Sequence, residues 1–211
     1  MPFGYTGQNL PNQTKANSGV FSISEVADLE KQGKFGGSLE LIEEKSISGV
    51  TVADFTNIKG TIYDVHFLTV NDVEVATDDD RLHLRFSNDG GSTFETTNYQ
   101  RANQQGESDG TFFESRTTTG SGLITTCLAG NATNEKSNAD IYLYNLSNSL
   151  KYSLQTWQSN SIRGNGTLER RFGGGVYAVA ETINAIRLYS NAGTNFSCTA
   201  KLYGVKQLWV L

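Results

Sequence analysis

Acidic side chains are the first residues to consider for chemistry in this chain. The consecutive carboxylates Asp78, Asp79 and Asp80 could offer oxygen ligands to Ca²⁺. A calcium loop, however, needs spaced ligands, a glycine at its sharp turn and a terminal glutamate, and none of that spacing occurs here. The pattern instead predicts a solvated turn before a strand that starts at Arg81. We therefore predict no metal site and no cofactor.

The two histidines, His66 and His83, are the other candidates for metal binding or general base catalysis. His83 alternates with Leu82 and Leu84, which predicts that it faces solvent. His66 has no cysteine or second histidine beside it, whereas a metal site needs three or four converging ligands. A Gly-x-Ser-x-Gly nucleophile elbow does not occur in the sequence. We predict no catalytic residue, and a non-enzymatic protein is favoured.

A glycine-rich turn at residues 87–94, Ser-Asn-Asp-Gly-Gly-Ser-Thr-Phe, resembles the Asp-box motif S-x-D-x-G-x-T-W, with Phe94 in place of tryptophan. Sialidases carry several copies, one in each propeller blade, whereas this chain has one copy and is too short for a propeller. The motif also occurs as a hairpin in which the aspartate binds turn amides and glycines adopt positive φ. This structural role is favoured, and a carbohydrate-active enzyme or a lectin is the less favoured alternative.

Aromatic residues in or beside the expected strands are the best general sign of recognition. Tyr142, Tyr144, Tyr152 and Trp157 have polar neighbours, and aromatic rings stack on sugars or anchor protein interfaces. Packing in the core is the alternative role for each of them.

Composition narrows the possible partners. The 211 residues carry a net charge of −5, and no cluster of lysine and arginine is present, so nucleic-acid binding is not expected. No apolar run reaches the roughly 20 residues of a membrane span, so membrane insertion is not expected either. The N-terminus lacks the pattern of a secretory signal. Cys127 and Cys198 are therefore predicted to be buried, reduced thiols.

The strand pattern predicts the fold class. Gly, Ser, Thr and Asn are abundant, charged residues are only 18%, and about eight to ten short strands follow one another at close spacing. Residues 81–86 alternate cleanly, whereas residues 141–144 are apolar on both faces. These features predict an all-β protein, an antiparallel β-sandwich of jelly-roll-like type, over residues 46–211.

Residues 1–45 are predicted to form a separate attachment module. The first eighteen residues are polar and aperiodic, which indicates an extended arm, and residues 24–32 have the cap and spacing of one short helix. Isolated apolar residues in an extended segment suit grooves on a partner surface. The residues predicted to attach the chain to its partner are Phe3, Tyr5, Leu10, Val20 and Phe21.

A symmetric homo-oligomer is the expected assembly, with apolar strand faces between the copies. The apolar run at residues 141–144 and the apolar C-terminal residues are the predicted interfaces. The candidate oligomer contacts are Tyr142, Tyr144, Leu208, Trp209 and Leu211.

Segments near both ends of the chain resemble a known group of proteins. Residues 12–22 (NQTKANSGVFS), 25–29 and 37–43 resemble an N-terminal module of marine tailed-bacteriophage virion proteins of the cyanophage type. Residues 183–189 and 199–205 resemble the C-terminal strands of the same proteins. The resemblance covers the middle of the chain only loosely.

The resemblance implies a structural protein of the virion that is made in the host cytoplasm. It favours a tail fibre or another host-contacting tail appendage, and a capsid decoration (cement) protein is the alternative. Because tail fibres are commonly trimers, the resemblance also implies that the expected homo-oligomer is a trimer. The implied partners are other virion proteins of the tail or capsid and a glycan or protein of the host surface.

Overall fold

The structure is a computed structural model that describes residues 23–24 and 38–206. Ile23 and Ser24 are helical, and the rest of the helix predicted at residues 24–32 lies outside the described residues. The same holds for several predicted contact residues, namely Phe3, Tyr5, Leu10, Val20, Phe21, Leu208, Trp209 and Leu211.

Residues 38–206 form twelve strands. Their bounds are β1 Leu39–Val50, β2 Val52–Phe55, β3 Val65–Val75, β4 Leu82–Ser87, β5 Tyr99–Glu107, β6 Phe112–Gly120, β7 Leu123–Ile124, β8 Ser137–Tyr144, β9 Tyr152–Ile162, β10 Leu168–Ala180, β11 Ala185–Ser190 and β12 Phe196–Val205. The first strand crosses the domain boundary predicted between residues 45 and 46, because β1 is already a member of the large sheet beside β12.

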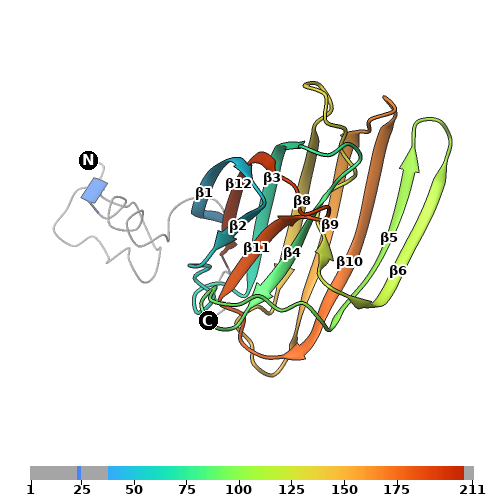
Figure 1. Cartoon of the computed structure of the whole chain (residues 1–211). Coiled ribbons are helices and arrows are strands. Elements are labelled where there is room, and N and C mark those ends of the chain that lie inside the picture. The colour runs from blue at the N-terminus through green and yellow to red at the C-terminus, as the bar shows by residue number, and fades with distance from the viewer. Residues whose placement is uncertain (1–22, 25–37, 207–211) are drawn as a thin grey trace, which may run out of the picture. The chain divides into compact units, whose positions relative to one another are not determined.

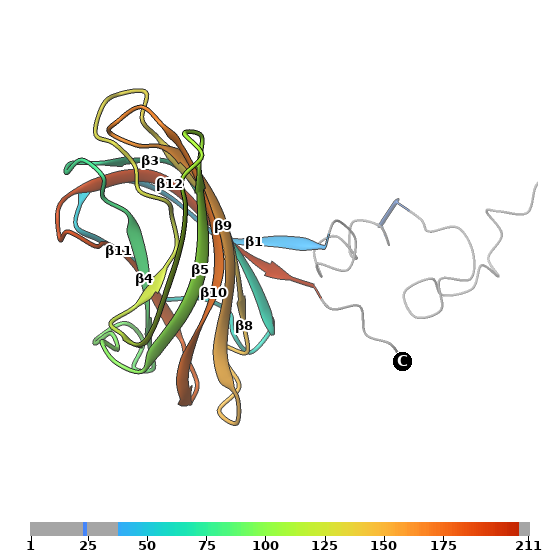
Figure 2. The same cartoon turned by 90° about the vertical axis from the view of Figure 1, so that its right-hand side faces the viewer.

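The strands form two facing sheets (Figures 1 and 2). The large sheet has the order β1-β12-β3-β8-β9-β10-β5-β6, and the small sheet has the order β2-β11-β4-β7. When β5, β6, β9 and β10 are set aside, successive strands alternate between the two sheets except for β4 and β7, which are neighbours in the small sheet. That alternation, with the first and last strands side by side, is the winding of a jelly roll. The predicted fold class is confirmed, and the four remaining strands extend the large sheet beyond β8.

Apolar side chains from the facing strands fill the space between the sheets. Leu82, Leu84 and Phe86 of β4 are fully buried, because alternate residues of a strand point to the same face. At one end of this core, Phe86 packs with Tyr99 and Tyr177 at ring-centroid distances of 6.1 and 6.0 Å. The Tyr99 hydroxyl accepts a hydrogen bond from the Phe86 amide at 2.8 Å, so the buried phenol has a partner.

The prediction that His83 faces solvent is wrong. Its side chain is only 3% exposed, because the ring of Tyr189 on the neighbouring strand packs edge-on against it at 5.6 Å. Burial, together with the guanidinium groups of nearby arginines, lowers the pKa of His83 to about 3. The imidazole is therefore neutral at physiological pH.

His66 and both cysteines are buried as well. The Nε2 atom of His66 lies 2.7 Å from the carbonyl oxygen of Ile58, and burial lowers the pKa of this histidine. Cys127 and Cys198 are free thiols, as predicted, and burial raises the pKa of each to about 12. Both thiols are therefore protonated and poorly reactive.

Asp78 and Asp79 lie in an exposed turn before β4, as predicted, whereas Asp80 is buried, and the three carboxylates contact three different loops. The Asp78 carboxylate accepts a hydrogen bond from the Asn131 amide at 3.2 Å. Asp79 binds Arg163, and Asp80, which is 3% exposed, accepts from the Ala192 amide at 3.1 Å. Carboxylates used in this way satisfy loop amides that would otherwise lack partners.

Candidate functional site

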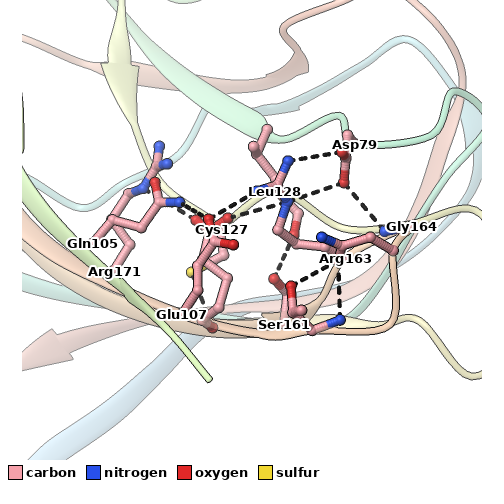
Figure 3. Close-up of polar contacts among 12 residues, drawn as sticks. Asp79, Gln105, Glu107, Cys127, Leu128, Ser161, Arg163, Gly164 and Arg171 are labelled. Atoms are coloured by element: carbon pink, nitrogen blue, oxygen red, sulfur yellow. Dashed lines mark hydrogen bonds and ion pairs between the residues drawn. The ribbon is translucent and has the colours of Figure 1, made fainter. Parts of the chain in front are cut away.

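Strands β5, β9 and β10, which extend the large sheet beyond β8, carry a buried polar network on the face directed to the inside of the sandwich (Figure 3). Glu107 of β5 and Glu169 of β10 are direct neighbours across the sheet. The guanidinium of Arg171 lies 3.1 Å from the fully buried Glu169 carboxylate. Arg163 lies 2.8 Å from Glu107 and 2.8 Å from Asp79. Buried charges of opposite sign thus compensate one another.

The electrostatics of the network agree with a structural role. Burial raises the pKa of Glu169, whereas the hydrogen bond from Arg163 lowers the pKa of Asp79 and in turn raises the pKa of Arg163. In the described residues, no group of three or more histidine, cysteine, aspartate or glutamate side chains could hold a metal ion. The network joins the ends of β5, β9 and β10 to the loops beside them.

The outer face of the large sheet has a different character, which follows from the strand register. Tyr203, Phe67 and Tyr142 are aligned across β12, β3 and β8. The ring centroids of Phe67 lie 6.1 Å from Tyr203 and 4.7 Å from Tyr142. Tyr144 stacks on Tyr142 at 6.4 Å. These residues form a row of four aromatic rings on the outer face, over strands β12, β3 and β8.

The same cross-strand row continues with three small residues. Tyr142 is opposite Thr156, which is opposite Gly174, which is opposite Ala102. Because these side chains are short, the sheet surface is hollowed there, with a volume of about 860 Å³. Its border includes Tyr144, Leu154, Val176 and Arg116.

A second hollow of about 360 Å³ adjoins the first and shares Thr156 with it. It is bordered by Tyr142 and Phe172, whose side chains are 40% and 49% exposed. We call the two hollows together the outer groove. Exposed rings and small floor residues in one concave place are the features of a ligand site.

Charges beside the outer groove balance one another. Arg116 pairs with Glu114 at 3.0 Å, and Arg170 of β10 donates a hydrogen bond to the Gln158 amide oxygen at 3.1 Å. Asp140 borders the second hollow together with Arg170. Arg101 also borders the first hollow, but its guanidinium donates a hydrogen bond to the Gly122 carbonyl oxygen at 2.8 Å. The other two arginines and the two carboxylates balance in charge.

The structure separates the aromatic residues that the sequence grouped together. Tyr142, Tyr144 and Tyr152 lie on the outer side of the large sheet, as expected for recognition residues, whereas Trp157 is 6% exposed and belongs to the core. Phe172 and the glycines beside it were missed. A run of three glycines, residues 173–175, within a strand was the available signal.

The Asp-box-like turn is a loop stabilised by its own hydrogen bonds and not the hairpin predicted, because β4 pairs with β11 and β7 and residues 93–98 form no strand. The Asp89 carboxylate accepts hydrogen bonds from the Thr93 amide at 2.9 Å and the Thr93 hydroxyl at 2.7 Å, which lowers its pKa to about 2. Gly90 and Gly91 have positive φ. The Arg187 guanidinium covers the Phe94 ring at 4.0 Å. The aspartate and the aromatic residue of the motif thus both take part in contacts within the chain.

Comparison with known proteins does not assign this chain to a family. The sequence matches no model of a known protein family, and no curated protein sequence matches it. Within the described residues, no helix has the length and apolar character needed to cross a membrane.

Proposed function

We propose that the chain is a non-enzymatic structural protein of a phage particle, a tail fibre or similar appendage that contacts the host through its jelly roll. The outer groove is the observation that carries this proposal, because it is the place where exposed rings, small floor residues and hydrogen-bonding side chains occur together. The resemblance of both chain ends to marine phage virion proteins supports the virion assignment.

The chemistry of the outer groove favours a neutral glycan as the ligand. A sugar ring has apolar faces that stack on aromatic rings and hydroxyl groups that bond to amides and hydroxyls. Tyr142 and Phe172 supply the rings, and Thr156 and Gln158 supply the polar groups. A charged ligand would meet no excess of opposite charge at this surface.

Loss of a groove ring is expected to weaken glycan binding. Phe172→Ala and Tyr142→Ala should each raise the Kd for neutral oligosaccharides by about tenfold, because each removes an exposed stacking platform. Binding is measured by calorimetry with oligosaccharides selected on a glycan array that also carries acidic sugars.

Tyr152→Ala is the matched control. Tyr152 is a similarly exposed ring on the same strand as Thr156 but does not border the groove, so its loss should leave Kd unchanged. An array without any signal would contradict the glycan assignment, and so would binding that survives both groove substitutions.

The attachment module gives a separate expectation for the intact particle. A chain without residues 1–21 should fold as the full chain does, because the first strand begins at Leu39, yet it should no longer join the virion. Incorporation is measured by antibody labelling of particles in electron micrographs, which also separates a tail appendage from a capsid decoration protein. Equal labelling of both forms would exclude residues 1–21 as the anchor.

A further inference from the structure

Strand β6 forms one edge of the large sheet and pairs only with β5 (Figure 1). It is nine residues long, and most of its side chains are exposed on both faces. Phe112 and Phe113 at its start are 80% and 55% exposed. An edge of this length offers a row of unpaired backbone groups to another strand.

The other sheet edges are protected in the ways that natural proteins use. In the small sheet, β2 has four residues and β7 has two, and short edge strands pair poorly. At the opposite edge of the large sheet, β1 carries the charged residues Glu40, Glu43, Glu44 and Lys45. Among the edges that the structure describes, β6 is therefore the one suited to strand addition.

The sequence of β6 is complementary to itself in one register. In two antiparallel copies of β6 related by a two-fold axis, Ser115 can lie opposite Ser115 of the second copy, so that residues whose numbers sum to 230 form pairs. Glu114 then faces Arg116 of a second copy, and this favourable pair occurs twice. Phe112 and Phe113 face threonines 118 and 117 of the second copy, and aromatic or opposite-charge pairs across strands are stabilising.

We propose that two copies of this chain associate edge to edge through β6, with the two-fold axis midway between the two copies of Ser115. Such an isologous contact closes on itself and yields a dimer. Because the axis is normal to the sheet, the outer faces of both copies are directed to the same side. This proposal does not depend on what the outer groove binds.

A cysteine at the axis tests the register directly. In Ser115→Cys the two new thiols would lie on directly opposed residues, whose Cα separation in antiparallel strands is about 4.5–5.5 Å and permits a disulfide. Thr119→Cys is the matched control on the same exposed strand, because its two copies would lie roughly 25 Å apart. Mild oxidation should link Ser115→Cys as a dimer and leave Thr119→Cys unlinked. Equal rates of linkage would overturn the proposal.

Charge reversal provides a second and independent test. Glu114→Arg or Arg116→Glu should raise the dimer Kd by about tenfold, since each places like charges opposite one another twice. The double variant Glu114→Arg with Arg116→Glu should restore the dimer in sedimentation experiments. A trimer, a monomer at all concentrations, or a double variant as weak as the single ones would contradict pairing through Ser115.

Discussion

Replacing Arg171 with methionine is expected to lower the free energy of unfolding by about 3–5 kcal/mol at neutral pH. The substitution leaves the fully buried Glu169 carboxylate without the guanidinium that lies 3.1 Å away. Arg163 is farther, at 3.8 Å, and is already engaged by Asp79 and Glu107. The loss is measured by urea denaturation, with the slope of the transition as a check that two-state unfolding persists.

Two further variants distinguish the effect of breaking the buried Arg171–Glu169 pair from the effect of removing any arginine charge. Arg116→Met removes an exposed partner in a surface ion pair and should leave the urea midpoint unchanged. The double variant Arg171→Met with Glu169→Leu removes both buried charges and should recover most of the stability. A double variant as unstable as Arg171→Met would show that the network acts through more than this pair.

The effect of Arg171→Met should also depend on pH. The pKa of Glu169 is already raised by burial in the native protein, so the folded state binds a proton at this carboxyl more readily than the unfolded state does. Stability from Glu169 therefore increases as pH falls through its folded pKa, and the increase stops below its unfolded pKa. Removing the nearby cation raises the folded pKa further, so the deficit of the variant should shrink between pH 7 and pH 5.

Gly173→Ala is expected to destabilise the fold by about 1–3 kcal/mol. An added Cβ atom at this position would lie 2.5 Å from the Ala102 carbonyl oxygen and 2.6 Å from the Asn103 Cβ atom. Both belong to the neighbouring strand β5, so β5 and β10 would have to separate. Thermal unfolding followed by circular dichroism measures the change.

Gly174→Ala is the control for this prediction. Its added Cβ atom meets only the Gln155 carbonyl oxygen, at 3.2 Å, and the loss of glycine reduces the entropy of the unfolded chain. Its unfolding temperature should therefore stay close to that of the parent chain. Equal losses for the two variants would show that the glycine run is needed for its backbone freedom rather than for close approach of the strands.

The fold could be predicted from sequence where burial follows simple alternation. The alternation of Leu82, Leu84 and Phe86 predicts the core face of β4, and the many short strands with polar turns indicate a sandwich. The same alternation predicted wrongly that His83 is exposed to solvent. A strand pattern does not show which residue, distant in sequence, covers the second face of the strand. That information comes from Tyr189, more than one hundred residues later.

The site was harder to predict because polarity is inverted along β9. Gln155 is buried, whereas its neighbour Leu154 is 43% exposed on the outer face. Burial of Gln155 is tolerated because its Nε2 atom donates a hydrogen bond to the Ile124 carbonyl oxygen at 2.7 Å, a partner 31 residues away in the chain. The outer groove likewise depends on strand register, which aligns Thr156, Gly174 and Ala102 although they are distant in sequence.

The adjacency of β1 and β12 has a consequence for how the chain is made. A hydrogen bond from the Gly49 amide to the Ser197 hydroxyl joins residues 148 positions apart, and contacts of such separation form late because loop closure precedes them. At a synthesis rate of about 5–20 residues per second, roughly 7–30 seconds pass between the emergence of these two partners from the ribosome. Throughout that interval the large sheet of the nascent chain lacks its last strand, and apolar surface of the incomplete sandwich is exposed. We therefore expect the yield of folded protein in cells to depend on chaperones that prevent aggregation during this interval more than on the stability of the finished fold.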